Sequence, residues 1–265
     1  MVTGAVAIAI YVMTQTEFSK DTKEILRALI GTFTGAALAF FSHRWHQQKK
    51  KIHEDRAALF LTFFILRAQF DDFLQFRSIL FRTIVGMHNE YVRGPLPPLW
   101  AYIKPFRYTF NPANVFAPES LVFLLEEKEG RSAFIQLQFV ERTYLELINA
   151  HADMHECAQD VQKKLSEGPH EAPWDVQERH LGPALAAKAR DVLFSALLRA
   201  DKDEGRFTEA LMKLNTAGHK IFSKGFSEFE IEIMAPLKKE NLPVLPDRIR
   251  THLGNLNAAN NLDAA

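Results

Sequence analysis

The stretch from Ile25 to Ser42 limits most strongly what this chain can be. It holds 18 residues with a single charge, Arg27, near its start. At 1.5 Å per residue a helix over this stretch would be about 27 Å long, close to the roughly 30 Å hydrocarbon core of a bilayer. The sequence therefore predicts a membrane-spanning helix here. The alternative is a buried helix of a soluble domain.

A basic segment follows the apolar stretch. It carries a tryptophan among positive charges, namely Arg44, Trp45, Lys49, Lys50 and Lys51. Tryptophan at the interface and lysine or arginine on the inner side are typical of the end of a spanning helix. At the opposite end, the long stem of Arg27 allows its guanidinium to reach the headgroups. The pattern predicts a juxtamembrane segment over 43–56 and places the bulk of the chain in the cytoplasm.

A second, shorter apolar stretch without charges covers residues 1–13. A helix of this length measures only about 20 Å, which is short for a bilayer. Together with the polar connection 17–24, it predicts a membrane anchor over 1–42 built as a helical hairpin. The alternative is one spanning helix preceded by an interfacial segment.

Small residues recur at helical spacing in both apolar stretches. They are Gly31, Gly35 and Ala39 in the second stretch, and Gly4, Ala5 and Ala9 in the first. Helices in lipid associate through close approach of their backbones, which small residues permit. We expect these residues to form a helix-packing surface, within the hairpin or between copies in a homo-oligomer.

The remainder predicts an all-α cytoplasmic domain over 57–250 and a mobile tail over 251–265. Apolar residues recur at helical spacing from 52 to 92, with charges that interrupt the run. Gly130 is expected to end a short helix that begins near Ser120. Residues 166–183 are expected to form a loop or turn, and 226–237 a short strand or strap. Further helices are expected over 132–165, 183–200 and 206–222.

Six of the 12 prolines lie between residues 95 and 118, which excludes a regular helix there. Aromatic residues are interleaved with them: Trp100, Tyr102, Phe106, Tyr108, Phe110 and Phe116. One interpretation is a long loop anchored by buried aromatic side chains. The other is an aromatic binding surface, with Lys104 and Arg107 beside it for a phosphate or nucleic-acid ligand.

Few residues indicate chemistry. The formal net charge is +0, and no direct nucleic-acid motif or phosphate-binding loop occurs. His151 and His155, four residues apart, are candidate metal ligands, although no third ligand can be named. Cys157 is the single cysteine, which fits a reducing compartment. We expect no cofactor, and the absence of the common catalytic motifs favours a non-enzymatic role while leaving an enzymatic one open.

Arg82 and His88 resemble the spaced arginine and histidine of HEPN-type ribonucleases. That resemblance implies a histidine that transfers a proton and an arginine that stabilises phosphate charge. The alternative is an ion-pairing arginine and a histidine near a helix end.

The whole layout resembles a class of small bacterial two-transmembrane effectors found beside retron reverse transcriptases in phage defence. The layout consists of the hairpin 1–42, the basic segment 43–56 and a helical domain that contains SLVFLLEEKEGRSAFIQLQFVERTYLELINAHADMHE. The resemblance implies a location in the bacterial inner membrane and a regulatory protein or nucleic-acid partner that restrains the chain. It also implies disruption of that membrane on release. The alternative is a membrane-tethered scaffold or sensor that binds a protein or a nucleotide.

Overall fold

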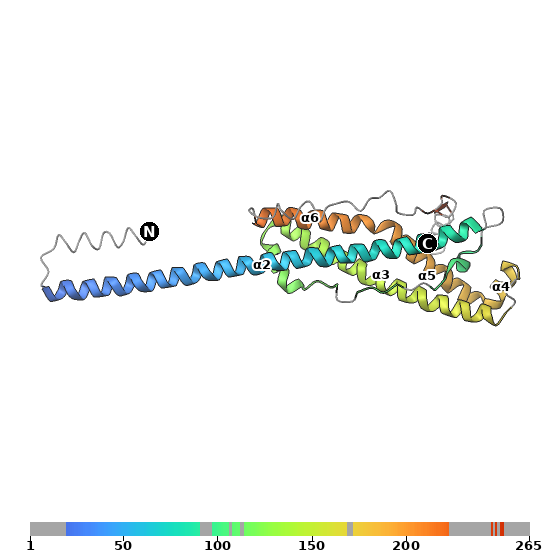
Figure 1. Ribbon diagram of the computed structural model, residues 1–265, viewed down its shortest axis with the longest axis horizontal. Helices are drawn as coiled ribbons and strands as arrows, with labels where there is room; N and C mark the ends of the chain where they lie inside the picture. Colours follow the sequence, from blue (N-terminus) through green and yellow to red (C-terminus); the bar gives the residue numbers. More distant parts are fainter. Residues whose placement is uncertain are drawn as a thin grey trace, which may run out of the picture. The chain divides into compact units, whose positions relative to one another are not determined.

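The computed structural model describes residues 20–90, 97–105, 108–111, 114–168 and 172–222, together with residues 245, 247, 250 and 251. These residues are mainly helical and include no strand, which confirms the all-α prediction. The chain divides into two compact units, Met1–Ala57 and Ala58–Ala265. Helix α2 (Lys20–Glu90) contributes residues to both units (Figure 1). The first predicted anchor helix and the predicted strand at 226–237 lie outside the described residues.

Two helices in succession pack along α3 (Lys128–Ser166) in the second unit. They are α5 (Pro183–Lys202) and α6 (Glu204–Phe222), and only Asp203 separates them (Figure 1). Their combined length matches that of α3, which has 39 residues. The second unit is therefore close to a three-helix bundle whose third helix is interrupted at Asp203.

In this bundle α2 and α3 run parallel, and α5 and α6 run antiparallel to both. Parallel neighbours require a connection that returns along the bundle, and the proline-rich segment is that connection. Its described residues meet α3 in reverse order along the chain. The contacts Asp72–Tyr144 and Phe76–His151 show that α2 and α3 are parallel. The contacts Phe70–Phe207 and Arg77–Glu204 show that α2 and α6 are antiparallel. The contacts Phe110–His151 and Phe116–Glu141 show that the connection runs antiparallel to α3.

Buried aromatic side chains anchor this connection. Trp100 in the short helix η1 (Leu99–Tyr102) is completely buried, and Tyr102, Phe110 and Phe116 are buried as well. For these residues the interpretation as an anchored loop is confirmed. Lys104 is exposed, whereas Phe106 and Arg107 lie outside the described residues.

One face of α2 supplies much of the core of the second unit. Leu59, Phe63 and Leu66 are buried, whereas Leu61 and Phe64 between them are 60% and 57% exposed. Further along the chain, the rings of Phe70 and Phe73 stack on Phe207 of α6, with centroid distances of 5.5 and 5.1 Å. One face of the run 59–66 is therefore buried and the other exposed, although its residues are apolar on nearly every side.

Two local predictions were wrong. Gly130 does not end a helix, because it lies in the first turn of α3, after the 3₁₀ helix η2 (Pro118–Glu126). A Cβ on Gly130 would lie 2.1 Å from the carbonyl oxygen of Leu124, so glycine is required where η2 packs against the start of α3. The predicted loop 166–183 contains a helix, α4 (Trp174–Leu181), which ends where Gly182 adopts a φ of 84°.

Candidate functional sites

Large apolar side chains are exposed on α2 in the first unit. Each of them has between 51% and 74% of its surface exposed. Isolated exposed apolar residues are ordinary on a soluble protein, but an extended apolar surface marks an interaction site. The residues concerned are Ile25, Leu29, Phe33, Leu38, Phe40, Phe41 and Trp45, with Ile52 further along the helix.

Large and small residues occupy different sides of this part of α2. At 100° per residue, the large apolar residues cover about 220° of the helix circumference. The small residues Ala28, Gly31, Gly35, Ala39 and Ser42 fall in the remaining sector, which we call the small-residue ridge. Among the described residues, nothing lies within 4 Å of a Cβ added at Gly31 or Gly35. The ridge is thus open in the part of the chain that the structure describes, and Gly4, Ala5 and Ala9 lie outside that part.

The exposed apolar stretch of α2 ends in a basic segment that contains Trp45. The ammonium nitrogen of Lys49 lies 3.8 Å from the ring centroid of Trp45, a cation–π contact. Arg44, Lys49, Lys50 and Lys51 are exposed on α2, as is Arg27 near its start.

The Thr32 hydroxyl, within the apolar stretch, donates to the carbonyl of Ala28 at 2.9 Å, so this polar group is satisfied without water. No helix in the described residues is both long enough and apolar enough to cross a membrane.

In the second unit, Asp72 of α2 is the acceptor for a cluster of donors. Its carboxylate accepts hydrogen bonds from the hydroxyl of Tyr144 at 2.5 Å, from that of Tyr108 at 2.7 Å and from the Asn114 amide at 3.4 Å. Burial, and then the hydrogen bond to Asp72, raises the pKa of both tyrosines, so both phenols remain donors. The cluster joins α2, α3 and the proline-rich connection, and sequence reasoning did not identify it.

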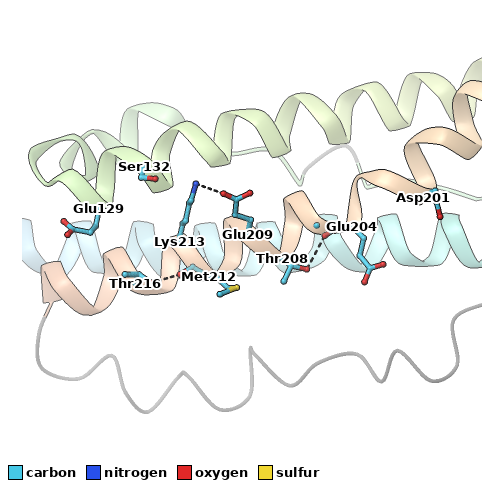
Figure 2. Close-up of a pocket in the computed structure, with 10 residues that line it drawn as sticks. Glu129, Ser132, Asp201, Glu204, Thr208, Glu209, Met212, Lys213 and Thr216 are labelled. Carbon is cyan, nitrogen blue, oxygen red and sulfur yellow. Dashed lines mark hydrogen bonds and ion pairs between the residues drawn. The ribbon is translucent and has the colours of Figure 1, made fainter. Parts of the chain in front are cut away.

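A groove of about 690 Å³ runs between α3 and α6 (Figure 2). Its charged side chains are paired: Lys213 contacts Glu209 at 2.6 Å, and Lys220 contacts Glu129 at 2.5 Å. The hydrogen bond from Lys220 holds the pKa of Glu129 below its usual range. Glu204 pairs with Arg77 in the same way. The acidic side chains of the lining are therefore ion-paired, most of them with cations that lie outside the groove.

A second cavity, of about 850 Å³, lies between the ends of α2 and α3, η1 and α4, and we call it the Trp174 cavity. Its floor is apolar and includes Met87, Ile103 and Val161. The rings of Trp100 and Trp174 meet edge to face at 5.8 Å, and the Trp100 nitrogen donates to Glu178 at 3.0 Å. Besides Trp100 and Trp174, five polar side chains line the cavity: Glu90, Lys104, Gln162, Ser166 and Gln177. The sequence singled out Lys104 but missed the cavity, because Trp174 lay in a predicted loop.

The candidate metal ligands on α3 are engaged by other groups. The rings of His151 and His155 stack at 6.3 Å, and His151 also meets the edges of Phe76 and Phe110. The Nε2 atom of His155 lies 3.0 Å from the amide nitrogen of Gln159. No group of three histidine, cysteine or acidic side chains suited to a metal occurs among the described residues.

The other candidates for chemistry are separated or shielded. Arg82 and His88 both lie on α2, where a six-residue separation directs them about 120° apart and about 9 Å apart along the axis. Arg82 is exposed and His88 is half-buried. Cys157 is fully buried, and that burial raises the pKa of its thiol, which opposes formation of a nucleophilic thiolate.

Comparison with known proteins gives no match to a family model, to a curated protein or to a solved structure. No activity, ligand or partner can therefore be transferred to this chain from a relative.

Proposed function

We propose that this chain is a membrane-anchored helical protein, held in the bilayer by residues 1–42, with its second unit in the cytoplasm of a bacterial cell. The supporting observation is the set of exposed large apolar side chains on α2 between Ile25 and Trp45. Transfer of such surface from water to lipid is favourable by about 25 cal/mol per Å². No described helix is both long enough and apolar enough to cross a membrane, so the proposal rests on these exposed side chains.

The chemistry at the end of the segment supports the same proposal. The Trp45–Lys49 pair has the amphipathic character of an interfacial anchor, and the positive charges around it favour the inner side of the membrane. The internal hydrogen bond of Thr32 leaves that hydroxyl no need for water.

Alkaline carbonate extraction of bacterial membranes tests the anchor. We expect the full chain to stay in the membrane pellet, and the double variant Phe33→Lys/Leu38→Lys to move to the soluble fraction. Each lysine near the centre of a span costs about 2.5–3.5 kcal/mol on insertion scales. The control is Phe64→Lys, which adds a charge to another exposed position of α2, in the second unit, and should stay in the pellet. Extraction of the unmodified chain by carbonate would contradict the anchor.

We further propose that the anchored chain is an antiviral effector that assembles in the inner membrane and disrupts it when a partner releases the chain. The observation that favours assembly is the small-residue ridge, whose glycines have no neighbour within 4 Å among the described residues. Close helix packing in lipid uses such surfaces. The alternative, a tethered scaffold or sensor, shares the anchor but not the assembly.

Induced expression distinguishes these activities. An effector should dissipate the membrane potential and slow growth, and Gly31→Ile or Gly35→Ile should relieve both effects by preventing close packing. The matched control Ala36→Ile adds similar bulk outside the ridge and should remain toxic. Harmless expression with a copurifying partner would favour the scaffold. Toxicity that survives both glycine substitutions but disappears with His88→Ala would favour the ribonuclease.

A further inference from the structure

We propose that the Trp174 cavity binds a nucleoside monophosphate. Its volume of about 850 Å³ lies within the range of cavities that hold small ligands. It combines an apolar floor with a few polar groups at the opening, as such sites do. Each part of a nucleoside monophosphate has a matching group in this lining.

The base is matched by an aromatic wall and two amides. Trp174 is half-buried at the cavity, and indole rings stack with the faces of bases. Gln162 is exposed at the opening, and an amide can both donate to and accept from the edge of a base. Gln177 donates its amide to the carbonyl of Ala172 at 2.7 Å, which orients the side chain and leaves its oxygen as an acceptor.

The phosphate and the ribose are matched by the two charged residues. Lys104 is exposed and has no ion-pair partner within the described ranges, so its ammonium group can bind a phosphate. Glu90, the last residue of α2, offers a carboxylate that can accept from ribose hydroxyls. The lining holds one lysine and one carboxylate, and this charge suits a single phosphate better than the larger negative charge of a triphosphate.

Isothermal titration of the full chain in detergent micelles, with AMP, adenosine and inorganic phosphate as probes, tests the proposal. We expect AMP to bind about tenfold more tightly than adenosine, and phosphate alone to bind much more weakly than either. Lys104→Gln should weaken AMP binding about tenfold and leave adenosine binding unchanged, because it removes only the contact with the phosphate. Trp174→Leu should weaken the binding of both.

Lys213→Gln, at the groove between α3 and α6, is the matched control and should bind all three probes as the unmodified chain does. Because Trp174→Leu could disturb packing, its thermal midpoint is compared with that of the unmodified chain; Lys104 is exposed and gives an independent test. The proposal fails if millimolar AMP does not bind, if Lys104→Gln weakens adenosine as much as AMP, or if phosphate binds as tightly as AMP. The titration in micelles does not depend on the anchor, so the two proposals fail separately.

Discussion

Asp72 shows how one carboxylate can hold a long connection in place. Its two tyrosine donors lie 36 and 72 residues further along the chain, at Tyr108 and Tyr144. Both hydroxyls are in a partly buried environment, where a hydrogen bond to a charged group contributes more than one at the surface. The cluster therefore stabilises the parallel arrangement of α2 and α3 through the segment that connects them.

Removal of one donor from this cluster tests its contribution to stability. Tyr144→Phe removes the hydroxyl that lies 2.5 Å from Asp72 and should lower the free energy of unfolding by about 1.5–3 kcal/mol. Urea unfolding of the detergent-solubilised chain, followed by circular dichroism, measures it. Thr216→Val is the control, because its exposed hydroxyl bonds only within its own helix and its loss should change the value by less than about 0.5 kcal/mol. Equal effects of the two substitutions would show that the Asp72 cluster does not stabilise the fold.

The partners of individual side chains were the feature that the sequence predicted least well. Nothing local distinguishes Asp72 from Asp71, because the difference between them depends on tyrosines far along the chain. The aromatic residues of the connection could be named from their spacing among prolines, and those described proved to be buried, apart from Tyr108, which is half-buried. The surroundings of His151 depended on the same connection, which brings Phe110 to it. The spacing of His151 and His155 therefore did not predict which groups surround them.

At the scale of elements, the ion pair between Arg199 of α5 and Glu146 of α3 makes the contact of these helices sensitive to pH. Arg199 approaches Glu146 to 2.5 Å, and Arg142 approaches it to 2.9 Å. The hydrogen bond from Arg199, and then that from Arg142, holds the pKa of Glu146 below its ordinary value of 4.5. For an acid whose pKa is lowered on folding, the stabilisation is present above the ordinary pKa and is lost as the pH falls through the lowered one.

Glu146→Gln should therefore lower stability at neutral pH but not in strong acid. We expect a loss of about 0.5–1 kcal/mol at pH 7, discounted because both side chains are partly exposed. The difference from the unmodified chain should shrink once the pH falls below 4.5 and approach zero below the lowered pKa. Thermal midpoints across this range measure it. Glu156→Gln is the control between the same two helices, because its 3.9 Å contact with Lys188 is more exposed. A Glu146→Gln effect that is equal at all pH values would contradict the assignment.

Helical periodicity predicted the existence of α3, α5 and α6 and placed their ends within a few residues. These helices are amphipathic, so their pattern is visible in the sequence. The sequence predicted neither the first residues of α3 nor any part of α4. For α3 the cause is a tertiary contact. Gly130 looks like a helix stop locally, whereas in the fold it allows the close approach of Leu124. A single residue, Asp203, separates α5 from α6, whereas the predicted helices 183–200 and 206–222 left a gap of five residues.

At the scale of the whole molecule, the chain combines a folded helical unit with an exposed apolar segment. Composition and periodicity predicted the all-α class. The parallel direction of α2 and α3 could not be predicted, because no local signal shows whether a proline-rich connection turns at once or returns along the bundle. The membrane anchor remains a prediction, carried by the exposed side chains between Ile25 and Trp45.

Cysteine labelling in intact membranes tests that anchor most directly. The only native cysteine, Cys157, is fully buried and has a raised pKa, so it should react slowly with a membrane-impermeant maleimide. Single cysteines are introduced by Phe33→Cys, within the proposed span, and by Gln47→Cys, beyond it on the same helix. Inverted inner-membrane vesicles expose the cytoplasmic side. We predict that Gln47→Cys is labelled in these vesicles, and that Phe33→Cys is labelled only after denaturation in detergent. Labelling of Phe33→Cys as rapidly as Gln47→Cys in intact vesicles would contradict the account.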